Sequence, residues 1–459
     1  MLFSEAAQDP SIGLNRITDV KYSDCSMRFR LKSKSDYSKQ YAHIYARRLD
    51  EMRPLLLERV TEKWGTKYLV KKMTDLREDN PEKCIIIGTT FVHQRLKPSI
   101  LREISEEAQL APQPIRQNYV DESDVLILED EVQRIQVLGN MKPHLFVTGI
   151  VCAVLGRLMK IRYENDEGKF YVDDCVFYES GPQKPLSIIC TSPLLVLISG
   201  LDQSSTQDFS MSLELFQQWI YGNLPNMFNE LDFEASNIIR VIVAGNSVRA
   251  TSENRPKTLL MRQPESVSTL QAVKSVDDIF HSWSKSVKVD LMPGEFDPSN
   301  CLMPQQPMHS CMFPDSSANS YFKCVTNPYE LEIEDRLILG TAGQNVSNIQ
   351  KYSNIEDPIE VLKSLVKWSI LAPTAPDTLP CYPYTDADPF IIKRCPHILF
   401  AGNTTEYGTT SYEDSKGQRI RLICVPSFSQ RESVVVVNLQ SLECKQLCFR
   451  VKGFEEIEP

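Results

Sequence analysis

The chain has 459 residues, of which 42% are hydrophobic and 24% charged, and it carries a formal net charge of −10. This length and apolar content allow two domains with full cores. The acidic balance argues against a protein that grips nucleic acid by itself, because phosphate contacts usually require a basic surface. Protein partners are therefore expected, with little or no direct binding of DNA.

The 13 cysteines are scattered along the chain and form no Cys-x-x-Cys pair. This pattern is typical of free thiols in a reducing compartment. The N-terminus lacks the basic head and apolar run of a signal peptide. The longest apolar stretch, near Leu145–Leu155, is shorter than the ~20 residues that a membrane span needs. We expect a soluble, intracellular protein that does not associate with membranes.

Residues 1–64 are predicted to hold a loosely attached arm followed by helices. From Ser35 to Trp64, apolar residues recur at three- and four-residue steps, as on one face of a helix. Pro54 is expected to interrupt this run and to begin a second helix, since proline is tolerated in a first turn. The basic pair Arg47 and Arg48 is interpreted as part of a solvated face.

Residues 65–180 change character to short strands with glycine bends, and a helical insert is predicted at Pro98–Gln109. Several short strands of this kind favour a small barrel, and the OB-fold is such a five-stranded barrel. The prolines and glycine of residues 181–192 indicate a linker. The strands are predicted at Lys83–Thr90, Val125–Leu128, Val132–Val137, Leu145–Leu158 and Gly168–Phe177.

Residues 193–459 are predicted to form an α/β domain, because apolar strands alternate with amphipathic helices. The helices are expected at Val267–Trp283 and Ile359–Leu371, and the last stretch, Arg419–Arg450, is expected to be antiparallel. Two proline-studded loops, Pro293–Pro314 and Pro373–Pro396, are long enough to suggest ordered, packed surface loops. The strands are predicted at Leu194–Ser199, Val241–Gly245, Val289–Pro293, Leu337–Gly340 and Ile398–Gly402.

Each of these predicted strands leads into a glycine and a polar loop. Loops beyond the carboxyl ends of strands are where α/β sheets build their sites. The order of the loops resembles the calcineurin-like phosphoesterase fold, whose active members hold two metals through Asp-x-His, Gly-Asp-x-x-Asp, Gly-Asn-His-Asp, a single His and Gly-His-x-His. Those side chains are required because paired metals polarise the phosphate and activate water.

The resemblance also shows where this chain departs from the active members. Gly200 and Asp202 replace the first Asp and His, and Asn246 and Arg249 replace the two aspartates of the second motif. The remaining replacements are Glu295 and Phe296 for Asn and His with Asp297 retained, Ala342 for the single His, and Asn403 and Thr405 for the last two histidines. The chain has six histidines, too few and too scattered for a dinuclear site. The resemblance therefore implies an inactive phosphoesterase-like domain with no bound metal and no catalytic residue.

Six strings in order along the chain resemble the second (B) subunits of the DNA polymerases alpha, delta and epsilon, and in particular the small subunits of the delta branch. They are YAHIYARRL at Tyr41–Leu49, PGEFDPSN at Pro293–Asn300, PQQPMHSCMFP at Pro304–Pro314, VTNPYE at Val325–Glu330, LGTAGQNVSNI at Leu339–Ile349 and LAPTAPDTLPCYPY at Leu371–Tyr384.

The resemblance implies a non-catalytic scaffold subunit of the nuclear polymerase delta complex, acting in replication and repair synthesis. A protein of this kind binds the C-terminal region of the catalytic subunit and carries a third accessory subunit that links the enzyme to the sliding clamp. In this family the iron–sulfur cluster belongs to the catalytic partner, so no cofactor is expected here.

Three alternatives remain open at this point. One is an active metallophosphoesterase or nuclease, which the missing ligands disfavour. Another is a single-stranded DNA-binding OB module, which needs exposed aromatic residues along a basic groove. The third is the second subunit of a different replicative polymerase.

Overall fold

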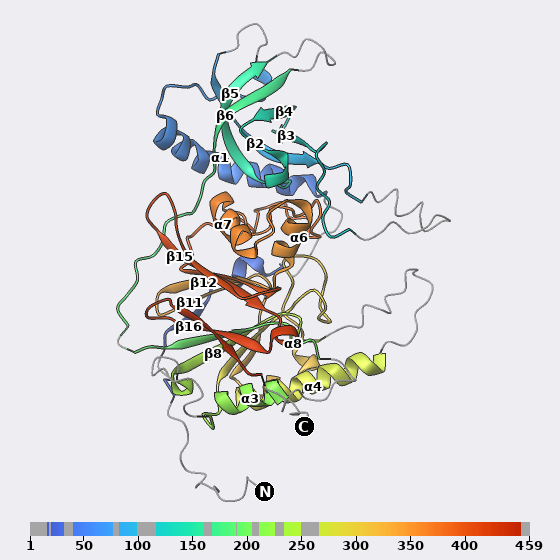
Figure 1. The fold of residues 1–459 in the computed structure, drawn as a ribbon, viewed down its shortest axis with the longest axis vertical. Coiled ribbons are helices and arrows are strands. Elements are labelled where there is room, and N and C mark those ends of the chain that lie inside the picture. The colour runs from blue at the N-terminus through green and yellow to red at the C-terminus, as the bar shows by residue number, and fades with distance from the viewer. Residues whose placement is uncertain are drawn as a thin grey trace, which may run out of the picture.

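In the computed structural model, the described residues are 16–17, 20–31, 40–76, 82–98, 116–159, 168–189, 191–203, 211–224, 234–248 and 266–450. They form a closed five-stranded barrel and an α/β domain with two six-stranded sheets. Figure 1 shows the barrel at the top, helix α1 beneath it, and the sheets below.

The barrel has the strand order β2-β3-β4-β6-β5, and it closes through the parallel pairing of β4 with β6. The strand-like run from Leu145 to Leu158, predicted to be broken at Gly149 and Gly156, is a strand only from Val151 on, so the part before Gly149 is wrong. Pro143–Leu145 is a short 3-10 turn, and Gly149 turns the chain with a φ of 94° before the strand begins. The predicted helix at Pro98–Gln109 falls, beyond Pro98, outside the described residues. The strands are β2 (Cys84–His93), β3 (Val125–Glu129), β4 (Arg134–Gly139), β5 (Val151–Met159) and β6 (Lys169–Val176).

Helix α1 (Ala42–Trp64) is continuous, so the predicted break at Pro54 is wrong. Its buried face, which includes Ile44 and Met52, packs against β2, β5 and β6. Pro54 lies on the exposed side together with Asp50, whose carbonyl loses its helical partner. Water can satisfy that carbonyl while the apolar face holds the helix together, and this is why the proline is tolerated.

Arg48 on the same helix corrects the interpretation of the basic pair as solvated. Its side chain is 0% exposed and forms an ion pair with Asp388, with 2.5 Å between Nε and Oδ2. Its remaining N–H groups donate to the carbonyls of Gly149, Pro373 and Ala375. One arginine therefore joins α1, the barrel and a loop of the α/β domain. Arg47, by contrast, is half exposed.

The two sheets of the α/β domain each combine parallel and antiparallel strands. The first has the order β1 (Tyr22–Asp24), β11 (Tyr329–Ile333), β12 (Arg336–Thr341), β13 (Ile398–Thr404), β15 (Arg419–Pro426) and β14 (Gly408–Glu413). The second has the order β10 (Phe322–Cys324), β9 (Lys288–Met292), β8 (Ile238–Ala244), β7 (Leu194–Ile198), β16 (Ser433–Asn438) and β17 (Cys444–Cys448). The expected antiparallel C-terminal stretch is only partly correct, because β15 is parallel to β13.

Three hydrophobic cores follow from the alternation of side chains along the strands. In the fully buried β7, Leu195 and Leu197 join the core between the two sheets, whereas Val196 points into the core under α3 and α4. A third core runs from the barrel through α1 to α6, α7 and the outer face of the first sheet. The barrel and the α/β domain therefore share one continuous apolar core.

The helices of the α/β domain cover the two outer faces, with α6 and α7 on the side of the barrel and α3 and α4 on the opposite side (Figure 1). Asp357 caps α7 by accepting from the N–H of Ile359 at 2.9 Å. Within the described residues, no helix is both long and apolar enough to cross a membrane. The helices are α3 (Met211–Ile220), α4 (Ser266–Ser284), α5 (Pro314–Ser317), α6 (Gln344–Tyr352), α7 (Pro358–Trp368) and α8 (Phe428–Arg431).

The N-terminal arm is not loosely attached where it is described. Strand β1 pairs antiparallel with β11 at the edge of the first sheet. After it, Ser26 exchanges hydrogen bonds with the backbone of Glu330, and Arg28 forms an ion pair with the Glu330 carboxylate at 3.0 Å. The pattern missed this strand because three residues are too few to show a period.

Candidate functional site

The carboxyl ends of β7, β8, β9, β12 and β13 bring their loops to one edge of the two sheets. We call the loops 199–203, 245–248, 293–297, 342–345 and 402–405 the strand-end site. The N–H of Gly200 donates to the carbonyl of Gly245 at 2.9 Å, and that of Asp202 to Asn246 at 3.0 Å. Left-handed backbone at Asp202, Asn246 and Asn403, with φ of 48°, 55° and 54°, turns the three loops toward each other.

The side chain of Asn403 links the two sheets at this edge. Its side-chain amide donates to the carbonyl of Ala244, at the end of β8, at 3.0 Å, and to the carbonyl of Ala342, after β12, at 2.9 Å. Packing here is too close for larger residues, since a Cβ on Gly245 would lie 2.7 Å from both Ala342 Cβ and Gly294 Cα. The edge is therefore filled by the protein's own backbone.

Asp297 is buried and its carboxylate accepts three backbone hydrogen bonds. Oδ1 accepts from the N–H groups of Ser247 at 2.8 Å and Val248 at 2.9 Å, and Oδ2 accepts from Gly294 at 2.8 Å. Burial raises the pKa of Asp297 to about 6, although these donors favour the charged form. This carboxylate ties the loop after β9 to the loop after β8.

The carboxylate of Asp202 accepts hydrogen bonds from two serines at the start of α8. Its Oδ2 accepts from the hydroxyl of Ser429 at 2.6 Å and from that of Ser427 at 3.2 Å. The side-chain oxygen of Asn246 accepts from the N–H of Phe296 at 3.2 Å. The side chains of Asp202 and Asn246 thus have partners in the protein. Three other side-chain atoms of the site are buried without a hydrogen-bond partner among the described residues: Gln203 Oε1, Ser247 Oγ and Asn345 Oδ1.

The remaining predicted residues are spread more widely. Glu295 and Thr405 are exposed, and Phe296 is half-buried. Thr405 lines a separate shallow cavity of about 370 Å³ together with Tyr407 and Asp357. Arg249 lies outside the described residues.

Three amide side chains belong to the site and were missed by the sequence reasoning. Asn327 accepts from the N–H of Ala342 at 3.0 Å and donates to Gln305 at 2.8 Å and to Gln344 at 2.7 Å. Gln305 in turn donates to the carbonyl of Gly294 at 2.9 Å. Their signal was present, because they fall inside the strings PQQP, TNPY and AGQN.

Among the described residues, no group of three or more His, Cys, Asp or Glu side chains is arranged to hold a metal ion. The three histidines of the α/β domain have other contacts. His397 is buried and accepts at Nδ1 from the N–H of Leu337 at 2.9 Å, and burial lowers its pKa. His309 caps a short 3-10 turn by accepting from Cys311, and His281 contacts the carbonyl of Asp315.

A groove between the barrel and α7 is a second candidate, with a volume of about 700 Å³. Its lining is apolar at the centre, where Phe146 and Phe177 stack with ring centroids 6.2 Å apart. Leu145 at its edge is 43% exposed, and Trp368 of α7 forms part of the opposite wall. Such a groove exists only because the two domains are fixed relative to each other.

Comparisons with known proteins agree with this architecture. The family of DNA polymerase alpha/epsilon B subunits matches residues 195–410, and the family described as "DNA polymerase delta subunit OB-fold domain" matches residues 40–175. The predicted combination of an OB-fold domain, an α/β domain and an N-terminal helical segment is confirmed.

The chain is similar over nearly its full length to curated relatives. "DNA polymerase delta subunit 2" of Drosophila melanogaster is 48% identical, covering 95% of this chain and 99% of the relative. "DNA polymerase delta small subunit" of Oryza sativa is 36% identical, with 94% and 97% covered. The protein of that name from Saccharomyces cerevisiae is 31% identical, with 94% and 93% covered. The predicted resemblance is confirmed, and the chain belongs to the family of DNA polymerase delta small subunits.

Proposed function

We propose that this chain is a non-catalytic scaffold subunit of the nuclear DNA polymerase delta complex. In this role it binds the C-terminal region of the catalytic subunit and carries a third accessory subunit that links the enzyme to the sliding clamp. The observation that carries the proposal is the strand-end site, where the protein's own groups occupy the positions at which an enzyme would present ligands to metals and substrate.

The engaged carboxylates support this choice over the rival enzyme. A two-metal site needs carboxylates with free lone pairs directed at the metals. Asp297 instead accepts three backbone N–H groups, and Asp202 accepts two serine hydroxyls. Asn403, which takes the place of a histidine, donates the N–H groups of its side-chain amide to two carbonyls. These groups stabilise the loops, and the ten positions predicted from the motifs are proposed to form a vestigial pocket.

The metal-free, inactive state of this pocket can be tested directly. Protein purified without chelator should contain less than one equivalent of manganese, zinc or iron. Hydrolysis of a bis-aryl phosphodiester should be equal for the wild type and for the variant Asp202→Ala/Glu295→Ala. Manganese-dependent turnover that this variant abolishes would restore the enzyme hypothesis.

The groove between the barrel and α7 is proposed as the docking surface for the catalytic subunit. Arg48 holds the two domains in one arrangement, so the groove presents a preformed apolar surface. Burying Leu145, which is 43% exposed, and the half-buried Phe146 would supply an apolar anchor of an interface, and the buried Phe177 supports the Phe146 ring from behind. The lining holds three carboxylates, of Glu356, Asp357 and Glu360, against the two lysines Lys142 and Lys367, and this slight acidic excess would favour a basic segment of the partner.

Affinity for the C-terminal region of a polymerase delta catalytic subunit tests this surface. Leu145→Asp should weaken the complex at least about tenfold, since it places a charge where an apolar side chain would be buried by the partner. Val132→Asp is the matched control, because Val132 is 75% exposed and precedes β4, whereas the groove lies beyond the other end of that strand. Equal affinity for both variants would contradict the proposed surface, and absence of any complex with the wild type would contradict the scaffold role.

Weak binding of DNA by the isolated chain is part of the proposal. The net charge is −10, and three of the barrel aromatics, Phe170, Phe177 and Tyr178, are buried in the core. Only exposed aromatic residues on a basic groove would support strand binding. Fluorescence anisotropy at physiological salt should show no submicromolar binding of single-stranded or duplex oligonucleotides, and salt-sensitive binding in that range would favour the OB module instead.

A further inference from the structure

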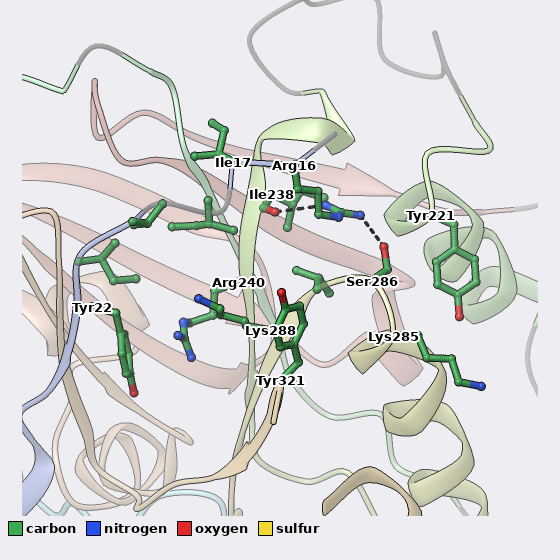
Figure 2. A pocket seen from close by; sticks show the side chains of 14 residues that line it. Arg16, Ile17, Tyr22, Tyr221, Ile238, Arg240, Lys285, Ser286, Lys288 and Tyr321 are labelled. Carbon is green, nitrogen blue, oxygen red and sulfur yellow. Dashed lines mark hydrogen bonds between the residues drawn. The ribbon is translucent and has the colours of Figure 1, made fainter. Parts of the chain in front are cut away.

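A second cavity lies at the other end of the parallel strands from the strand-end site. It has a volume of about 620 Å³ and opens where β8 and β9 begin, at Ile238 and Lys288. The N-terminal arm forms one of its walls through Arg16 and Tyr22, and the residue after α3, Tyr221, forms another (Figure 2). Neither the family resemblance nor the proposed scaffold role involves this cavity.

The described residues that line the cavity carry four cations and no carboxylate. The cations are Arg16, Arg240, Lys285 and Lys288. Arg240 has a partner, because its Nη1 donates to Asp290 at 2.5 Å while its guanidinium lies 3.9 Å from the centroid of the Tyr22 ring. The local charge is therefore opposite to the net charge of −10 of the whole chain.

Arg16 is held in place entirely by neutral acceptors. Its Nη1 donates to the carbonyls of Ala235 at 2.7 Å and Ile238 at 3.2 Å. Its Nη2 donates to the hydroxyl of Ser286 at 3.0 Å and to the carbonyl of Ile220. Figure 2 shows the guanidinium between Ile238 and Ser286. Burial lowers the pKa of Arg16 to about 10, so the side chain remains protonated near neutral pH. A fixed positive charge with no carboxylate beside it favours a bound anion.

Lys288 supplies a charged donor that can reach a ligand. Its Nζ lies 5.9 Å from the centroid of the Tyr321 ring, and Tyr321 is 39% exposed. Lys285 also lines the cavity, but Figure 2 shows its side chain directed away from Arg240 and Tyr321. The hydroxyl of Ser286, which accepts from Arg16, keeps its own hydrogen for donation.

We propose that this cavity binds a phosphate-bearing small molecule of nucleotide size. Lys288 would donate to phosphate oxygens in the field of Arg16, and the ring of Tyr321 would contact an organic moiety. A phosphate accepts charge-assisted hydrogen bonds, which suits a lining with cations and no carboxylate among its described residues. The volume falls within the 300–1,000 Å³ that is typical of small-ligand sites. A nucleic-acid strand would instead require an open basic groove.

The experiment is titration calorimetry of the full chain with dATP, tripolyphosphate and deoxyadenosine, without divalent cations. Saturable binding of dATP and tripolyphosphate that weakens with added salt is expected, with no detectable binding of deoxyadenosine. The variant Lys288→Gln should weaken dATP binding at least about tenfold, because Lys288 provides a charge-assisted hydrogen bond.

The matched control is Lys274→Gln. Lys274 is an exposed lysine of α4 that does not line the cavity and has no partner among the described residues. This control should bind dATP as the wild type does. If both variants lose affinity equally, the binding reflects net charge alone, and the proposal is wrong.

Other outcomes would also overturn the proposal. These are no saturable binding of dATP or tripolyphosphate below about 1 mM, or deoxyadenosine binding as tightly as dATP. Single-stranded oligonucleotides that bind far more tightly than dATP, and that depend on Lys288, would assign the surface to a nucleic-acid strand instead. All of these results are independent of whether the groove beside α7 binds the catalytic subunit.

Discussion

Arg48 and Asp388 form a fully buried ion pair between the helix that packs on the barrel and a loop of the α/β domain. Each side chain is 0% exposed, so neither charge can turn to water if its partner is removed. Asp388 also accepts from the N–H of Phe390 at 2.9 Å, which fixes the loop around it. The pair therefore determines how the two domains sit against each other.

Arg48→Met should destabilise the protein by about 3–5 kcal/mol, because it leaves the Asp388 carboxylate buried and uncompensated. Arg47→Met, one residue earlier on the half-exposed face, should change the free energy of unfolding by less than about 0.5 kcal/mol. Urea unfolding measures both. The double variant Arg48→Met/Asp388→Leu should recover part of the loss, and a double variant as unstable as the sum of its single variants would contradict the coupling.

Gly149 lies beside this ion pair, so a substitution there tests how closely the barrel packs against the α/β domain. A Cβ at Gly149 would lie 2.0 Å from the carbonyl oxygen of Pro373 and 2.7 Å from Nη1 of Arg48, at a φ of 94°. Gly149→Ala should cost about 2–4 kcal/mol, because the backbone of the other domain must move. Gly417→Ala, at a φ of 76° with nothing within 4 Å, should cost only the backbone strain of about 1–2 kcal/mol. If thermal unfolding shows the same loss of stability for both variants, the contact between the barrel and the α/β domain adjusts easily to the added Cβ, and the prediction is wrong.

The buried Asp297 should make stability depend on pH in a defined direction. Burial raises its pKa from 3.8 to about 6 in the folded chain, so the folded state holds the proton more tightly than the unfolded state. This contribution to stability is fully present below about pH 4 and is lost as the pH rises through about 6, up to about 3 kcal/mol in all.

The comparison with Asp297→Asn isolates this contribution, since asparagine does not titrate. In urea titrations, the unfolding free energy of the wild type minus that of the variant should decrease as the pH rises from 4.5 to 7.5. A difference that stays constant over this pH range would mean that the three backbone donors offset burial and hold the pKa of Asp297 at or below its ordinary value.

The N-terminal arm should contribute measurably to stability through Arg28. The side chain of Arg28 contacts the Glu330 carboxylate at 3.0 Å and the carbonyl of Pro389 at 3.0 Å, and Glu330 is only 8% exposed. Arg28→Ala should cost about 2–3 kcal/mol. Arg30→Ala is the control, because Arg30 is 42% exposed and lies 3.7 Å from Asp24, and it should cost less than about 1 kcal/mol. If the two variants melt at the same temperature, the arm is not anchored through Arg28.

Much of the architecture follows from the sequence by itself. The buried run of β7, the alternation of strands with helices after residue 193, and the short strands before residue 180 are local patterns, and local patterns are written in consecutive residues. The departures from the phosphoesterase motifs at Gly200, Asn246 and Asn403 are visible in the same way. Motif strings such as PGEFDPSN likewise require no coordinates to point to the family.

The contacts that complete the molecule were decided only by the tertiary structure. Arg48 and Asp388 are 340 positions apart, so nothing in the neighbourhood of Arg48 distinguishes a buried arginine from the half-exposed Arg47. Strand β1 is three residues long and is defined by its partner β11. The carboxylates of Asp297 and Asp202 accept hydrogen bonds from segments that follow other strands. Burial and charge pairing depend on which distant segments of the chain come into contact. The local periodicity of the sequence does not specify those contacts.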